Sequence, residues 1–223
     1  MKIVAIDTST EFCSVALWLD GELVSRERHV GPRHSEFLLP MLDELFTTTK
    51  TRLNEFFGIA FGAGPGSFTG LRIACGVTQG LALGANLPVV GVSTLLAIAE
   101  ASGAARAVCC MDARMSEVYH AAYTREGDDW ATIHEPGLYK PQSVPDIDGN
   151  DWIGCGNGFA VYEQALLNRY AGQVVCLQAT LFPHAKEIAR LAVPLFERGM
   201  GREAVNAVPI YVRDKVALRI DER

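Results

Sequence analysis

The chain has 223 residues, a length that allows one large domain or two small ones and that can bury a substantial core. Hydrophobic residues make up 49% of it and charged residues 21%, which excludes a disordered tail, a collagen-like repeat and a coiled coil. The 26 acidic residues outnumber the 20 lysines and arginines, so free binding to RNA or to an anionic membrane is not expected.

Cysteine and histidine usage indicates a reduced protein without a metal centre. The six cysteines include no C-x-x-C pair, and no two of the five histidines are three or four residues apart, as a metal-binding pair on a helix requires. The N-terminus begins with a strand-like run rather than a signal peptide, and no uncharged apolar run is long enough to span a membrane. We therefore predict a cytoplasmic protein.

The first half of the chain alternates predicted strands and helices. Residues 3–6 form a short apolar run, typical of a strand covered on both faces, and a polar turn at residues 7–10 follows it. This order of elements is typical of an α/β protein with a partly parallel sheet. The other predicted strands are 13–19, 23–30, 56–61 and 88–92, and the predicted helices are 35–49, 67–85 and 94–102.

The pattern starts again after residue 103. The string AIDTSTEFCSVAL near the N-terminus and the string CMDARMSEVYHAA from residue 110 share a strand that ends in Asp, a polar turn and a second strand. This weak repeat predicts two α/β lobes, residues 1–103 and 104–223. The second lobe has predicted strands at 107–111, 117–123, 130–139 and 152–155, helices ending near 170 and spanning 183–198, and an extended tail at 208–213.

Two polar strings at strand ends are candidates for ligand binding. Asp7 ends the first strand, where actin-like kinases hold phosphate and metal, although an Asp that caps its own turn explains the residue as well. In the string GPGSFTG at residues 64–70, Ser67 begins a helix whose free N–H groups can hold an anion, and a ligand-free tight connection is the equal alternative. The string is neither a Walker A loop nor a nucleophile elbow. The predicted nucleotide contacts are Asp7, Thr8, Ser9, Gly66 and Ser67.

The predicted helix 67–85 is unusually apolar and contains three glycines spaced four residues apart. Each glycine costs roughly 1 kcal/mol relative to alanine in a helix, so close approach by another element is expected to offset the cost. Burial inside its own lobe is one interpretation, and a subunit interface is the other. Because helix 35–49 is also strongly apolar, we favour an interface. The predicted interface residues are Phe37, Met41, Leu45, Leu71, Gly76, Val77, Gly80, Leu81 and Gly84.

Five strings identify a family resemblance that covers nearly the whole chain. AIDTST, GPGSFTGLR, GVSTL, MDARMSEVY and PIYVR, in this order and spacing, resemble the TsaB family, also called YeaZ. The resemblance implies the ASKHA fold of actin-like ATPases, which is α/β with two lobes of mixed sheets flanked by helices. It also implies a non-catalytic subunit that TsaD requires to transfer a threonylcarbamoyl group to adenosine 37 of tRNAs that read codons beginning with A.

The resemblance implies a set of partners as well. These are TsaD in a heterodimer, the small ATPase TsaE in a larger complex, and a second copy in a homodimer when the chain is alone. The tRNA would be reached only through the complex, and no membrane is involved. The chain alone would bind no cofactor, and ATP or ADP is a candidate at the TsaD interface.

A stand-alone hydrolase, either a protease of the M22 type or an ATPase, is the main alternative, and a small-molecule kinase is the third. TsaD-like proteins carry a metal-binding H-x-x-x-H, and here Thr94 and Ile98 stand in place of its histidines. An isoleucine cannot ligate a metal. Ser9 stands where actin-like kinases often have glycine, which argues against independent ATP binding. Both departures favour the non-catalytic subunit. The sequence leaves open which interface residues contact TsaD and which contact a second copy.

Overall fold

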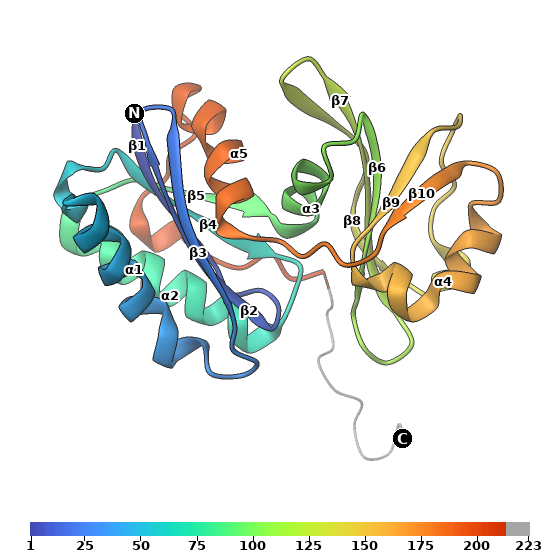
Figure 1. Ribbon diagram of the computed structural model, residues 1–223, viewed down its shortest axis with the longest axis horizontal. Helices are drawn as coiled ribbons and strands as arrows, with labels where there is room; N and C mark the ends of the chain where they lie inside the picture. Colours follow the sequence, from blue (N-terminus) through green and yellow to red (C-terminus); the bar gives the residue numbers. More distant parts are fainter. Residues whose placement is uncertain (213–223) are drawn as a thin grey trace.

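A computed structural model describes residues 1–212 and shows two α/β lobes side by side (Figure 1). The first sheet has the strand order β3-β2-β1-β4-β5. Its first three strands form an antiparallel meander, and β4 and β5 run parallel to β1. The elements of this half are β1 Lys2–Asp7, β2 Phe12–Leu19, β3 Glu22–His29, α1 His34–Thr49, η1 Leu53–Glu55, β4 Gly58–Gly64, α2 Phe68–Ala85, β5 Val89–Ser93 and α3 Thr94–Ser102.

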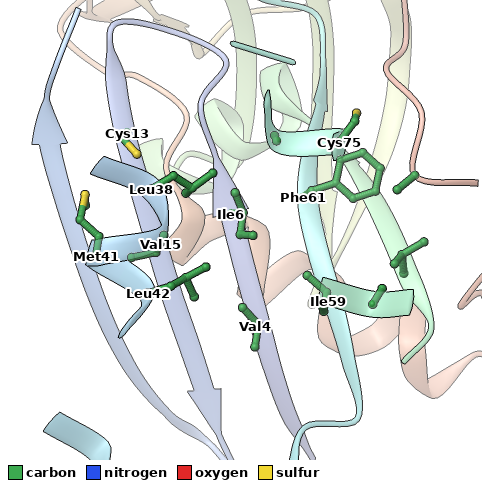
Figure 2. Packing of buried hydrophobic residues seen from close by; sticks show 14 of the residues in the cluster. Val4, Ile6, Cys13, Val15, Leu38, Met41, Leu42, Ile59, Phe61 and Cys75 are labelled. Atoms are coloured by element: carbon green, nitrogen blue, oxygen red, sulfur yellow. The ribbon is translucent and has the colours of Figure 1, made fainter. Parts of the chain in front are cut away.

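Strand β1 is covered on both faces, as its continuous apolar sequence predicts. Val4 and Ile6 point to one side and belong to a core with helices α1 and α2, as Figure 2 shows. Ile3 and Ala5 point to the other side and pack with helix α5, Ala185–Glu197. Side chains alternate along a strand, so a strand in the middle layer must be apolar at every position.

The second sheet repeats the topology of the first. Its order, β8-β7-β6-β9-β10, combines an antiparallel meander with two parallel strands in the same places as β3-β2-β1-β4-β5. The weak sequence repeat therefore corresponds to a structural repeat, with β1 and β6 as equivalent strands. The elements are β6 Arg106–Asp112, β7 Val118–Glu126, β8 Asp129–Tyr139, η2 Pro141–Ser143, β9 Trp152–Cys155, α4 Asn157–Arg169 and β10 Val174–Gln178.

The last helix of each half covers the sheet of the other half. Helix α3 follows β5 of the first sheet, yet Leu95, Ile98 and Ala99 pack against β6, β7 and β9. Helix α5 follows β10, yet Ile188 and Ala192 pack against the first sheet. The predicted division at residue 103 separates the two sheets, but residues 185–197 of the predicted second lobe complete the core of the first.

The segment after α5 returns along the first lobe. Arg202 forms an isolated antiparallel bridge with Val89 of β5, and a short helix, η3 Ala204–Asn206, follows. The Ile210 N–H donates to the Ala63 carbonyl over 2.7 Å, which ties residues 208–212 to β4. This stretch is not part of a strand, and residue 213 of the predicted extended tail lies outside the described residues.

Candidate functional site

The two lobes enclose a cleft of about 700 Å³. The first lobe contributes the turn after β1 and the start of α2, and the second lobe contributes the β6–β7 turn and the start of α4. Ile210, Tyr211 and Val212 line it as well. Pockets at domain junctions are common binding sites because both sides can supply polar groups, so the cleft is the candidate site for a small ligand.

The polar groups of the predicted nucleotide-binding turn are used inside the protein. Asp7 is fully buried, and its Oδ1 accepts hydrogen bonds from the Ser9 N–H at 3.2 Å and the Ser9 hydroxyl at 2.9 Å. The Thr8 hydroxyl donates to the Gly70 carbonyl at 2.7 Å. Of these three residues only Ser9 lines the cleft, with 1% of its surface exposed. In this arrangement the Asp7 carboxyl and the Thr8 hydroxyl are bonded inside the protein, and Ser9 is the residue of the three that lines the cleft.

The glycines of the 64–70 string are required by packing against the same turn. A Cβ on Gly70 would lie 1.8 Å from the Thr8 carbonyl oxygen, and one on Gly66 would lie 2.5 Å from that of Ser9. The Ser67 N–H donates to the Ser9 carbonyl at 2.7 Å, and the Ser67 hydroxyl caps α2 by accepting from the Gly70 N–H. Gly66 and Ser67 both line the cleft, so the start of α2 is the part of the predicted contact set that faces a ligand.

The surroundings of Asp7 disfavour its charged form. Burial raises the pKa of its carboxyl to about 7, and the two hydrogen bonds from Ser9 only partly oppose this shift. The second oxygen, Oδ2, has no hydrogen-bond partner and lies so close to β4 that a Cβ on Gly62 would be 1.9 Å away. An ionised carboxylate in this place costs stability, because burial removes its charge from bulk solvent.

We expect the Asp7→Asn variant to gain stability relative to wild type as pH rises. The folded-state pKa of Asp7, about 7, lies above its unfolded value near 3.8, so the folded state binds the proton more tightly and wild-type stability falls as pH rises between these two values. Between pH 5 and pH 8 the difference in free energy of unfolding should shift by roughly 2–3 kcal/mol in favour of the variant. Thermal unfolding of both proteins at the two pH values measures the shift.

The exposed Asp20 provides the control for this experiment. The N-terminal amino group lowers the pKa of its carboxyl, so Asp20→Asn should show no gain on going to pH 8. If Asp7→Asn and wild type keep the same stability difference at both pH values, Asp7 is not held in the protonated form by burial.

The second lobe presents an equivalent aspartate that does reach the cleft. Asp112 ends β6 as Asp7 ends β1, and its Oδ1 accepts from the Arg114 N–H at 3.0 Å and the Tyr162 hydroxyl at 3.2 Å. Residues 114–116 are all in the left-handed region, with φ of 63°, 54° and 58°, which is costly for residues other than glycine. Asp112 thus holds a strained turn at the rim of the cleft. The sequence repeat, which aligns Asp112 with Asp7, could have identified this residue as a candidate.

The predicted interface residues separate into two groups. Met41 and Leu45 are buried in the core of the first lobe, where Figure 2 shows Met41 beside Leu38 and Leu42. Leu71 is buried too, but it lies beside Gly64 of β4 and lines the cleft between the lobes. Burial inside the chain leaves these three side chains little surface for a partner to contact. Phe37, Val77 and Leu81 are half-buried at the edge of this core.

The outer face of α2 carries the remaining predicted residues. Gly76, Gly80 and Gly84 are exposed, and a Cβ on any of them would meet no atom within 4 Å. Leu83, which the prediction missed, lies on the same helix with 78% of its surface exposed. We call residues 76, 80, 83 and 84 the α2 outer face.

The two positions that replace the histidines of TsaD-like proteins are part of the interior. Thr94 is buried and donates to the Pro65 carbonyl at 2.5 Å, and Ile98 is buried among the residues of the second lobe. Within residues 1–212, no three His, Cys, Asp or Glu side chains are grouped so that they could hold a metal ion. No helix in this part of the chain is both long and apolar enough to cross a bilayer.

Comparison with known proteins places the chain in a family. It is 39% identical over 226 residues to the tRNA threonylcarbamoyladenosine biosynthesis protein TsaB of Escherichia coli, a match that covers 97% of this chain and 96% of that protein. The TsaB of Haemophilus influenzae is 35% identical, with 97% of this chain and 95% of that one covered. The chain belongs to the TsaB family.

The structural comparison agrees with this assignment. The solved structure of YeaZ from Pseudomonas aeruginosa superposes with a TM-score of 0.88 at 39% identity, and the match covers 94% of this chain and 99% of that chain. A family model described as tRNA N6-adenosine threonylcarbamoyltransferase, TsaD, matches residues 28–219. TsaB and TsaD therefore share a fold, and the predicted ASKHA architecture with two lobes of mixed sheets is confirmed for this member of the TsaB family.

Proposed function

We propose that this chain is a non-catalytic subunit of the machinery that makes threonylcarbamoyladenosine in tRNA, and that it acts together with TsaD. The observation that carries the proposal is the similarity to TsaB of Escherichia coli along almost the entire length of both proteins. Because the match includes both lobes, it concerns the whole molecule rather than a shared domain.

Three buried side chains support the non-catalytic role. Where TsaD-like proteins would place metal-binding histidines, Thr94 bonds to a backbone carbonyl and Ile98 fills the core. Asp7, the residue at the position of a phosphate- or metal-binding carboxylate, is buried and bonded to its own turn. Three positions that would serve catalysis are thus occupied by structural contacts.

The α2 outer face is the surface that we propose for TsaD, and for a second copy when the chain is alone. Its glycines allow the backbone of another helix to approach closely, and the exposed Leu83 supplies apolar area. TsaE would join the resulting complex, and tRNA would contact the assembly rather than this chain by itself. For ATP or ADP, which would bind in the complex with TsaD, Gly66 and Ser67 are the candidate contacts of this chain, because both line the cleft between its lobes.

A reconstitution experiment tests the proposed function. TsaD and TsaE from the same organism, supplied with the threonylcarbamoyl donor and tRNA, should modify the tRNA only when this chain is present, and this chain without TsaD should produce no modified tRNA. Nucleoside analysis of the digested tRNA provides the measurement. Modification at the full rate without this chain would contradict the proposal, as would transfer by this chain alone.

The same purified protein distinguishes the proposed subunit from a stand-alone hydrolase. A protease or ATPase of the M22 type would cleave a protein substrate or release phosphate from ATP without TsaD. We expect neither activity from the purified chain, and a turnover that survives a second purification step would favour the hydrolase.

A further inference from the structure

Two arginines share one aromatic ring at the start of α1. The guanidinium carbon of Arg28, on β3, lies 5.0 Å from the centre of the Phe37 ring, and that of Arg33, just before α1, lies 5.1 Å from it. Phe37 was predicted as an apolar partner contact, and in the structure its ring contacts the guanidinium groups of both arginines. An exposed cation–π contact contributes only about 0.5–1 kcal/mol, so the ring orients the two guanidinium groups without neutralising them.

The guanidinium charges of Arg28 and Arg33 are largely unpaired by the acidic side chains around them. Arg26, two residues before Arg28 on the same strand, donates from Nε to the Glu44 carboxylate over 3.0 Å. Among residues 1–212, no carboxylate comes within 4.0 Å of the Arg28 guanidinium, and Arg33 has only Glu36, at 3.9 Å with both side chains well exposed. A contact of this kind is weak because water screens it. Strand β3 therefore carries one paired arginine and one unpaired arginine, both next to α1.

The geometry of the cluster suits a carboxylate. Arginine presents a planar fork of N–H donors, and a fixed guanidinium can bind a carboxylate through two parallel hydrogen bonds. Helix α1 begins at residue 34 without a side-chain cap, so its first N–H groups add a partial positive charge in the same place. An acidic group would therefore pair with charges that the described residues leave largely unpaired.

We propose that Arg28, Phe37 and Arg33 form a docking point for an acidic segment of the TsaD partner. The inference rests on the proposed function and adds the chemistry of the contact. A protein carboxylate is a better fit than an RNA backbone, because two cations on a chain of net charge −6 neutralise too few phosphates to hold RNA. Arginine and aromatic residues are also the usual anchors of protein interfaces.

The test compares Arg28→Gln/Arg33→Gln with wild type in binding to purified TsaD from the same organism. We expect the double variant to bind at least ten-fold more weakly at low salt, and its affinity to fall less steeply as salt is raised. Arg26→Gln is the matched control, because that arginine is already paired with Glu44, and it should change affinity less than three-fold. Thermal unfolding checks that each variant remains folded.

The possible results separate the inference from the function on which it rests. If wild type binds TsaD and the double variant binds with the same affinity and salt dependence, the docking point is refuted while the proposed function stands. If wild type does not bind TsaD at all, both fail. A gel-shift experiment with tRNA and the isolated chain tests the remaining alternative. If the wild-type chain binds tRNA and the double variant does not, the arginines bind phosphate and the inference is overturned.

Discussion

Replacing Gly80 with glutamate should leave the protein folded and weaken its association with TsaD by more than 100-fold. The fold should survive because a Cβ at residue 80 meets no atom within 4 Å and because glutamate is a better helix former than glycine. Association should fail because the charge would be buried without a partner against another helix, which costs several kcal/mol. Calorimetry or gel filtration of the mixed proteins measures the loss, and tRNA modification should fall with it.

The control for Gly80→Glu places the same charge on a different helix. Val161 of α4 is 55% exposed and lies in the second lobe, so Val161→Glu should bind TsaD like wild type. If Gly80→Glu also binds like wild type while remaining folded, the partner contacts another surface and the α2 outer face is not the interface. If Gly80→Glu unfolds, the description of residue 80 as exposed is incorrect.

Two alanine substitutions on helix α2 should change stability in opposite directions. Gly70→Ala brings a methyl group to within 1.8 Å of the Thr8 carbonyl oxygen, a backbone atom that cannot move without breaking the turn after β1. We expect it to lower the free energy of unfolding by roughly 3 kcal/mol or more. Gly76→Ala adds a methyl group in open space within the helix, and it should raise the same free energy by about 0.5–1 kcal/mol.

Thermal unfolding measures this pair of variants at one pH. For a chain of this size, 1 kcal/mol corresponds to a change of about 2–4 °C in Tm, so Gly70→Ala should melt about 10 °C lower than wild type. A normal Tm for Gly70→Ala would show that residues 7–9 can move away from α2. Packing against the turn after β1 would then not explain the glycine at residue 70.

The local structure could be predicted from sequence wherever periodicity was strong. The predicted helices 35–49 and 67–85 correspond to α1 at 34–49 and α2 at 68–85. Strand β10 was missed, since the five residues VVCLQ show neither a helical nor an alternating pattern. Its position depends on parallel pairing with β9 more than twenty residues earlier, which a local pattern does not contain.

The site was harder to predict because burial depends on partners that are remote in sequence. An apolar residue of α1 or α2 can face its own sheet or a partner, and periodicity alone does not say which side is which. Met41 and Leu45 face the sheet, whereas Leu83 faces outward. In the same way, an Asp at a strand end can reach a cleft, as Asp112 does, or be enclosed, as Asp7 is by β4.

The exchange of helices between the two halves ties their folding together. Without α5, the face of the first sheet formed by Ile3, Ala5 and Ala60 would be left open to water, and without α3 the second sheet would lose the cover over Cys109 and Ala121. Each half therefore supplies a part that the other cannot replace. Residues 1–103 made alone would expose an apolar surface, and on a ribosome one face of the first sheet stays uncovered until α5, which ends at residue 197, has emerged. We therefore expect the two lobes to unfold together, in a single transition.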